Sequence, residues 1–436
     1  MTPHDAFDRR LKTWLDVAAA GGMPDALLES VLESTRERRS RPGWIVALRG
    51  GGMSATIHLG GQPIHRVAYV LLLVALALVA ALLLAGVGAR HLRTNGRIAF
   101  YRTSDSTSSG SAFMIDPDGS NETSMPAGIG ALSPDGSKRV GGFCQSWCRP
   151  VITNAEGTSG FRILDAYPGR KMDLVPSAWS PDGSRILVWS GIEDGDPSDA
   201  GLYTVRSSDG GDLKRLVETP RDVGDTPLGY SPDGSRILFS RIGAEPGVFV
   251  VKADGGGLRQ LSPPNWRPVN LESWHDLSAD WSPDGSHVVF AATETLAQSP
   301  ALYLVDPDGT SLNEIVSPEV GAWSARWSPN GDMIALTSDH RGTGTPDGEK
   351  LGQPQVWVIN GDGSGLRQLT NGADGSNSAT PVWSPDGTKL LFQRKQNDQV
   401  ALWTMNADGS EQTQLTALPV AGDFVGGYVW AASAAR

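Results

Sequence analysis

From about residue 96 onward, short apolar runs alternate with polar turns along the rest of the chain. A typical run is Arg-Ile-Leu-Val at 185–188; it follows the tetrapeptide Ser-Pro-Asp-Gly, which one large residue, Trp179, precedes. Proline presets φ at the second position of a type I turn, aspartate tolerates the third position and glycine relieves the fourth. The pattern therefore predicts a strand, a tight turn and a second strand.

This tetrapeptide recurs at intervals of 47, 51, 51, 46 and 56 residues, a period typical of repeat architectures. Five copies contain aspartate and one contains asparagine; their prolines are Pro134, Pro181, Pro232, Pro283, Pro329 and Pro385. A large aromatic residue precedes most of the copies, and an apolar run follows. The chain is therefore organised around a repeated module.

A second hairpin motif follows in each repeat. An apolar run such as Leu-Tyr-Leu-Val at 302–305 leads to an Asp-Gly pair, and a closing strand such as Leu-Arg-Gln-Leu at 366–369 comes after it. Four strands in about 50 residues form the unit of a β-propeller blade. The Asp-Gly pair or its equivalent occurs seven times, at Asp118, Glu156, Asp209, Asp254, Asp308, Asp362 and Asp408.

The first of these seven units lacks the tetrapeptide, and only Gly-Arg-Ile-Ala-Phe at 96–100 precedes it. The stretch Gly-Tyr-Val-Trp-Ala at 427–431 resembles the innermost strand of a blade, so we expect it to complete the blade that begins at residue 97. The predicted fold is all-β: a seven-bladed β-propeller of four-stranded antiparallel blades over residues 97–432, closed by the C-terminal strand, with a tail at 433–436.

The chain before the repeats has a different character. Residues 67–89 contain no charge and stand between Arg66 and Arg90. As a helix they would span roughly 35 Å, which is enough to cross a bilayer. A cleaved signal peptide would begin near residue 1, so we expect a retained transmembrane helix, followed by a linker at 90–96.

Residues 1–66 are expected to form an N-terminal segment with two short amphipathic helices before about residue 45. These helices would serve as a docking unit, or they would pack on themselves or on the bilayer surface. A wide window of flanking arginines favours a cytoplasmic N-terminus, whereas a window of about 20 residues does not. We expect the N-terminus in the cytoplasm because the cysteines and the family resemblance described below both indicate an external propeller.

The composition and net charge of the chain argue against one class of binding partner, the nucleic acids. The chain has 53 glycines and 29 prolines and only 19% charged residues, which suits a turn-rich β protein. Its net charge is −11, and the acidity belongs to the repeats: residues 1–66 hold nine bases and seven acids, and the chain after Arg90 holds 27 bases and 41 acids. Binding to a nucleic acid through its backbone is therefore not expected.

The two cysteines, Cys144 and Cys148, are separated by three residues. This spacing fits neither a zinc site nor a Cys-x-x-Cys redox motif. Outside the cytoplasm, a local disulfide at the end of a hairpin is the favoured interpretation, with free thiols as the alternative.

The repeated Trp-Ser-Pro-Asp-Gly-x-x-Ile/Leu, followed by Leu-Tyr-x-Val-x-x-Asp-Gly and a closing Leu-Thr, resembles the TolB-type, WD-repeat-like propeller family. The resemblance covers nearly all of 97–432 and implies the fold, but it does not imply one function. Similar blades occur in prolyl-oligopeptidase-type enzymes and in bacterial surface and sensor proteins. TolB itself has a cleaved signal and an N-terminal α/β domain, so a role in the Tol–Pal system does not carry over.

Residues for catalysis were sought in the sequence. No Gly-x-Ser-x-Gly or His-Glu-x-x-His is present, and the seven histidines are scattered, so no cofactor, metal or enzymatic activity is expected. One acidic loop carries Asp194, Asp196 and Asp199, which is a weak candidate for calcium. Solvated turn residues are the simpler interpretation of this loop.

Blade geometry points to a binding surface instead. The turns between first and second and between third and fourth strands share one rim, while the long, variable connections share the other. Binding residues concentrate on variable loops of a rigid scaffold. The most distinctive connections are 262–278 and 338–355, with the candidate binding residues Trp266, Trp274, His275, Asp339, His340 and Arg341; either tryptophan would otherwise pack under its own loop.

The sequence therefore predicts a single-pass, membrane-anchored propeller outside the membrane, acting as a non-catalytic binding or scaffold module for a protein, peptide or glycan. One alternative is a transmembrane sensor that signals through residues 1–45. Another is a propeller enzyme of lyase or hydrolase type, which would need acid, base or metal ligands converging on the central channel.

Overall fold

The computed structural model describes most of the repeat region and no residue before Asn95. The described ranges are 95–104, 107–125, 131–144, 148–155, 159–163, 174–190, 199–220, 223–268, 279–294, 299–339, 353–397, 399–416 and 424–432. Within these ranges no helix is long and apolar enough to span a bilayer. The predictions for 1–66, for the span 67–89 and for the tail 433–436 lie outside the described residues.

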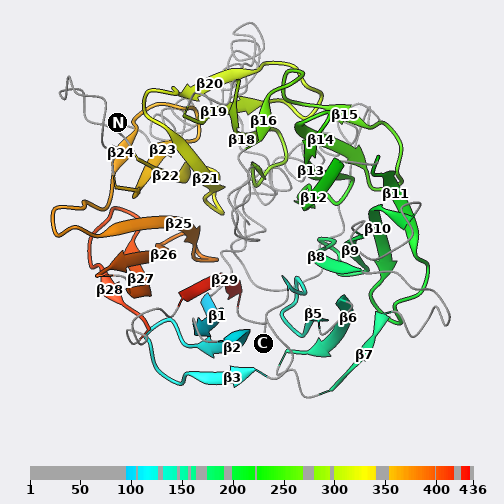
Figure 1. Ribbon diagram of the computed structural model, residues 1–436, viewed down its shortest axis with the longest axis horizontal. Coiled ribbons are helices and arrows are strands. Elements are labelled where there is room, and N and C mark those ends of the chain that lie inside the picture. Colours follow the sequence, from blue (N-terminus) through cyan, green and yellow to red (C-terminus); the bar gives the residue numbers. More distant parts are fainter. Residues whose placement is uncertain are drawn as a thin grey trace, which may run out of the picture. The chain divides into compact units, whose positions relative to one another are not determined.

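Seven antiparallel sheets follow one another around a ring (Figure 1). We number the sheets as blades 1–7 in chain order and give the strands of each from the centre outwards. Blade 1 has β29 (Phe424–Ala432), β1 (Asn95–Ser104), β2 (Thr107–Ile115) and β3 (Thr123–Met125). Blade 2 has β4 (Ala131–Leu132), β5 (Lys138–Cys144), β6 (Cys148–Asn154) and β7 (Gly160–Arg162). Blade 3 has β8 (Val175–Trp179), β9 (Arg185–Ser190), β10 (Gly201–Arg206) and β11 (Lys214–Glu218).

The remaining blades repeat this order. Blade 4 has β12 (Val223–Tyr230), β13 (Arg236–Gly243), β14 (Gly247–Lys252) and β15 (Arg259–Gln260). Blade 5 has β16 (Arg267–Pro268) and β17 (Ala279–Trp281), then β18 (Val288–Thr293), β19 (Ala301–Val305) and β20 (Asn313–Val316). Blade 6 has β21 (Ala322–Trp327), β22 (Met333–Ser338), β23 (Gln355–Asn360) and β24 (Arg367–Gln368). Blade 7 has β25 (Asn377–Trp383), β26 (Lys389–Gln396), β27 (Gln399–Asn406) and β28 (Thr413–Gln414).

The C-terminal strand closes the ring, as the sequence predicts. Strand β29 pairs with β1, with Trp430 opposite Ile98 and Val429 opposite Ala99 (Figure 1). The indole Nε1 of Trp430 donates to the carbonyl oxygen of Gly96 at 3.2 Å. Blade 1 is thus built from both ends of the repeat region, which leaves no unpaired edge at the junction.

Blade 5 departs from the predicted four strands. Both β16 and β17 pair with β18: Pro268 lies opposite Ala292, and Ala279 lies opposite Phe290. Two separately described segments, β16 and β17, therefore pair with β18 in this blade. The long connection that the sequence assigned to a loop contributes two of its residues to the sheet.

The Ser-Pro-Asp-Gly turn is held by its own side chains. In blade 4 the hydroxyl of Ser231 donates to Asp233 at 2.5 Å, and the same carboxylate oxygen accepts the backbone N–H of Ser235 at 3.0 Å. These hydrogen bonds lower the pKa of Asp233 to about 2. Gly234 has a φ of +72°, which favours glycine, and a Cβ there would stand 3.4 Å from Pro181 in the turn of blade 3. The motif therefore fixes the turn and also spaces neighbouring blades.

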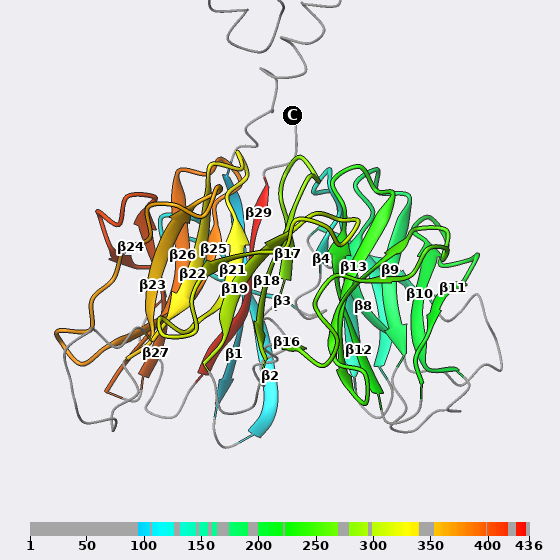
Figure 2. The ribbon, with the colours of Figure 1, turned by 90° about the horizontal axis from the view of Figure 1, so that it is seen from above.

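The hydrophobic core lies between the blades. Alternate residues of the middle strands face the preceding blade: Phe239 and Phe249 of blade 4 pack with Leu187 and Leu202 of blade 3. The strands cross the thickness of the ring, so these layers extend from one rim to the other (Figure 2). Strand alternation explains the pattern, because successive side chains point to opposite faces of a sheet.

Candidate functional site

The ring has two rims of different chemistry. The turn rim carries the short repeated turns, such as 282–285 and 308–309. The loop rim carries the connections between second and third strands, such as 339–354, and those between blades, such as 369–376. The sequence predicts binding on the loop rim.

Two of the predicted binding residues are described, and they belong to different blades. Trp266 is half-buried, and its ring centroid lies 4.7 Å from the ring centroid of Tyr303. The Tyr303 centroid lies in turn 5.4 Å from the ring centroid of Phe290. Trp266 therefore packs on its own blade. Asp339 follows the last residue of β22 and is half-buried, and a Cβ on Gly321 would stand 2.5 Å from its Oδ1.

The other predicted residues are placed only in part. Trp274, His275, His340 and Arg341 lie outside the described residues, as do Asp194 and Asp196 of the weak calcium candidate. Among the residues that the structure describes, no group of three or more His, Cys, Asp or Glu side chains could hold a metal ion. Asp199 is half-buried, and its backbone oxygen accepts the Tyr203 hydroxyl at 2.7 Å.

The cysteines lie at the end of a hairpin, where the sequence places them. Cys144 ends β5, Cys148 begins β6, and the two are direct partners in the register. Directly opposed strand residues are close enough in space for a short cross-link. The disulfide itself stays a prediction.

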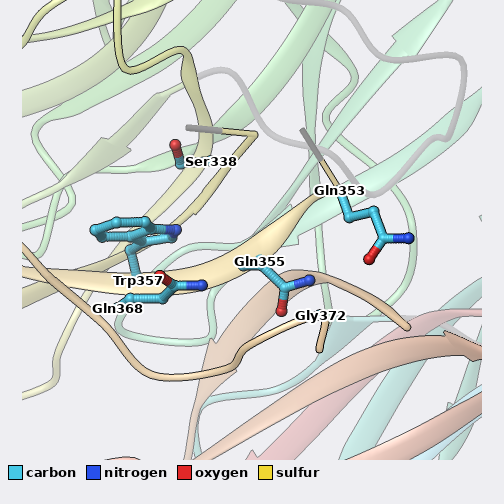
Figure 3. A pocket seen from close by; sticks show the side chains of 6 residues that line it. All are labelled: Ser338, Gln353, Gln355, Trp357, Gln368 and Gly372. Carbon is cyan, nitrogen blue, oxygen red and sulfur yellow. The ribbon is translucent and has the colours of Figure 1, made fainter. Parts of the chain in front are cut away.

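A pocket of about 260 Å³ opens on the loop rim of blade 6. Four of its residues belong to strands of one sheet, and the other two flank β23 and β24 in the connections (Figure 3). Its lining is polar apart from one indole ring. The lining residues are Ser338, Gln353, Gln355, Trp357, Gln368 and Gly372.

Gln355 forms the fixed part of this pocket. Its side chain is 4% exposed, and its Oε1 accepts the hydroxyl of Thr370 at 2.7 Å. Its Nε2 donates to the carbonyl oxygen of Ser376 at 2.9 Å. The Thr370 oxygen also accepts the backbone N–H of Val356 at 2.9 Å. Both ends of the buried amide are therefore satisfied, which holds the side chain in one orientation.

Two more glutamines line the opening, and both are exposed. The Nε2 of Gln368 donates to the carbonyl oxygen of Thr370 at 2.6 Å. The amide nitrogen of Gln353, in the orientation that satisfies both of its polar groups, donates to Gly372 and Ser376 carbonyl oxygens at 3.1 and 3.3 Å. A Cβ at Gly372 would stand 2.4 Å from the Gln353 amide, so a larger residue there would displace it.

Gln355 breaks the repeat. At the equivalent register position, blades 3, 4, 5 and 7 have small residues, Gly201, Gly247, Ala301 and Ala401, whereas blade 2 has Arg149. The sequence pointed to the stretch 338–355, which contains three of the six lining residues, but it did not single them out. A signal was present: the third strands of blades 2 and 6 have a long polar residue at this position, where the other five have small residues.

A larger hollow of about 570 Å³ lies on the turn rim, between blades 5 and 6. It is lined by repeated turn residues, including Asp284, His287 and Asp362. Burial alone would raise the pKa of Asp284, but hydrogen bonds from Ser282 and Ser286 lower it to about 2. Asp362 likewise accepts the hydroxyl of Ser364, which lowers its pKa. These carboxylates already hold their own turns, and the sequence did not predict this hollow.

Residues 264–420 match the family model of the TolB β-propeller domain, PD40. This part of the propeller is similar to the TolB β-propeller domain. Among curated proteins, the uncharacterized protein Atu1656 of Agrobacterium fabrum is 27% identical over 219 residues, covering 49% of this chain and 63% of that protein. The Tol-Pal system protein TolB of Anaeromyxobacter dehalogenans (strain 2CP-C) is 30% identical over 114 residues, covering 26% of this chain and 23% of TolB. The match spans less than two thirds of either relative.

Solved structures confirm the fold. The β-propeller domain of the Trilobed protease from Pyrococcus furiosus aligns with a TM-score of 0.52 and 12% sequence identity, covering 74% of this chain and 94% of that domain. Identity at this level reports shared architecture and not shared function.

Proposed function

We propose that this chain is a membrane-anchored, extracytoplasmic propeller that binds a protein, peptide or glycan on its loop rim and catalyses no reaction. The observation that carries the proposal is the blade 6 pocket. Its lining departs from the repeat at Gln355, and its amides are held by hydrogen bonds to backbone and hydroxyl groups. A buried polar side chain at a position where most blades have a small residue, placed on the variable rim, suits a binding site.

The TolB-like propeller supports a role in protein interaction, since one relative is named as a component of the Tol-Pal system. The anchor would be the apolar stretch 67–89, with residues 1–66 in the cytoplasm. The acidic repeat region would then lie outside the membrane.

Binding can be tested with the purified full chain in detergent, presented to a peptide library and a glycan array. Replacing Gln353 and Gln368 by alanine in one variant should abolish capture of the strongest ligands. The matched variant His287→Ala, on the turn rim, should leave capture unchanged. If capture is unchanged by the double glutamine variant but is lost in His287→Ala, binding takes place on the turn rim and the proposal is wrong.

Anchoring is tested separately. Deleting 67–89 should release the chain from the membrane fraction of cells. After mild reduction, a thiol reagent that cannot cross membranes should label Cys144 and Cys148 in intact cells. Retention of the deletion variant in the membrane, or labelling only after lysis, would refute the anchor or the orientation respectively.

A further inference from the structure

Three blades contain the same internal site. Near the end of the second strand, an arginine lies over two aromatic rings, one on its own strand and one on the third strand. In blade 1 the guanidinium carbon of Arg102 lies 5.5 and 4.7 Å from the ring centroids of Phe100 and Phe113. In blade 4 that of Arg241 lies 5.7 and 5.0 Å from the centroids of Phe239 and Phe249. In blade 7 that of Arg394 lies 5.3 and 4.4 Å from the centroids of Phe392 and Trp403.

Oxygen acceptors complete each site, and they need not be charged. Glu122 accepts from Arg102 at 3.0 and 3.1 Å, and Asp225 accepts from Arg241 at 2.7 and 2.8 Å. In blade 7, Arg394 donates to the hydroxyl of Ser378 at 3.2 Å and to the amide oxygen of Gln412 at 2.5 Å. In blade 7 the groups hydrogen-bonded to the guanidinium are therefore neutral, and the carboxylate of Asp374 acts on it through its charge alone.

Blade 6 has the same backbone register without the arginine. Ser338 pairs with Gln355 as Arg394 pairs with Ala401. Two residues along, Trp357 pairs with Leu336 as Trp403 pairs with Phe392. Ser338 thus stands at the arginine position, and Trp357 stands at the position of the ring that the guanidinium covers.

The other blades with an aromatic residue at this point close the space themselves. In blade 5 the arginine position is Ala292, and Trp266 reaches in from the preceding connection to cover Tyr303. In blade 3 Tyr203 is 3% exposed, and its hydroxyl donates to the backbone oxygen of Asp199. In blade 6 the corresponding space is the pocket of about 260 Å³ (Figure 3).

We propose that the blade 6 pocket binds the guanidinium of an arginine side chain from a partner polypeptide. The Trp357 ring supplies the cation–π surface, and the amide oxygens of Gln353 and Gln368 supply acceptors. The pocket lies just below the roughly 300–1,000 Å³ of sites for drug-sized ligands, so one side chain suits it better than a long ligand. The inference rests on the proposed function, because it names the ligand chemistry of the same site.

Charge favours the same occupant. The chain after Arg90 carries 27 bases and 41 acids, so the repeats as a whole attract cations and repel anions. An arginine gains from this field as well as from the ring. A neutral sugar would stack on Trp357 without that gain, so the charge dependence of binding separates the two.

The test uses the full chain in detergent micelles and ligand-observed saturation-transfer NMR, which detects weak binding. The probes are N-acetyl-arginine methylamide, its citrulline analogue, which has the same shape without the charge, and methyl α-galactoside. We expect binding of the arginine probe, at least tenfold weaker binding of the citrulline probe, and no competition by the sugar. Equal binding of arginine and citrulline, or displacement of arginine by the sugar, would overturn the proposal.

Variants locate the site. Trp357→Leu should weaken binding of the arginine probe at least tenfold, and Trp357→Phe should weaken it less. Ser338→Arg should rebuild the internal arginine of the other blades and block the probe, whereas Ser190→Arg, at the same register position in blade 3, should not. Circular-dichroism melting checks that each variant folds. A Ser338→Arg variant that folds and binds the probe as well as the parent refutes the assignment.

The two proposals fail differently. Ligands captured on the loop rim whose binding is unchanged by Ser338→Arg would leave the function standing and remove the arginine assignment. Binding of the arginine probe that Ser338→Arg blocks, in a chain that captures no peptide from the library, would do the reverse.

Discussion

Replacing Asp225 by alanine should destabilise the propeller strongly, because it removes the partner of a buried guanidinium. The side chains of Arg241 and Asp225 are 5% and 1% exposed, and they form two hydrogen bonds of 2.7 and 2.8 Å. The hydroxyl of Thr219 donates to the same carboxylate at 2.8 Å and would lose its acceptor as well.

The expected cost is about 3–5 kcal/mol of unfolding free energy, because breaking a buried pair leaves one charge uncompensated. The rings of Phe239 and Phe249 would still face the guanidinium, but a cation–π contact supplies only about 0.5–2 kcal/mol. A double variant, Asp225→Ala with Arg241→Met, removes both charges and keeps most of the volume. It should be less destabilised than Asp225→Ala alone.

Urea unfolding of the full chain, followed by far-UV circular dichroism, measures these differences. The matched control is Glu122→Ala, which breaks the equivalent pair in blade 1. There the side chains of Arg102 and Glu122 are 24% and 32% exposed, so the loss should be at most about 1 kcal/mol. Equal losses for Asp225→Ala and Glu122→Ala, or a double variant as unstable as Asp225→Ala, would refute the reasoning from burial.

Three further predictions concern other parts of the ring. Burial raises the pKa of Asp280 to about 6, so its contribution to stability is full below about pH 4 and is lost as pH rises through 6. The variant Asp280→Asn should therefore show a flatter dependence of the melting temperature on pH between pH 4 and 7. An unchanged pH profile would contradict this. Trp430→Ala should cost about 3–5 kcal/mol in urea unfolding, since the ring is 6% exposed in the closing strand; a loss below about 1 kcal/mol would show that closure does not depend on it. Cys144 and Cys148 should resist alkylation until a reductant is added, as mass spectrometry would show, and alkylation without reductant would exclude the disulfide.

The propeller architecture could be predicted from the sequence because the motifs that specify it are local. Each Ser-Pro-Asp-Gly turn is satisfied within a few residues, as Ser231 and Asp233 show, so the sequence encodes it without help from distant contacts. Closure by the C-terminal strand also followed, since one strand was missing at the start and one remained at the end. The additional strand β16 of blade 5 did not follow: Arg267 and Pro268 carry no strand pattern, and only pairing with β18 makes them part of the sheet.

The candidate site was predictable only as a region. The stretch 338–355 stood out for its length and its departure from the repeat, and it contains Ser338, Gln353 and Gln355. In the sequence, Trp357 looks like any other apolar residue of a third strand and Gly372 like any glycine of a turn, so neither could be selected as a site residue. Trp266, which looked distinctive, packs on Tyr303.

The sequence by itself determined the repeat, the turn chemistry, the strand order and the closing of the ring, because these depend on residues close together in the chain or on a count of strands. Only the tertiary structure decided where the repeats leave a space. That space depends on what stands beside Trp357: Ser338 takes the place that Arg394 has in blade 7, whereas in blade 5 Trp266 covers the equivalent ring of Tyr303. A side chain missing from one register position has no signature in the chain until the hydrogen-bonded strands place it opposite its neighbours.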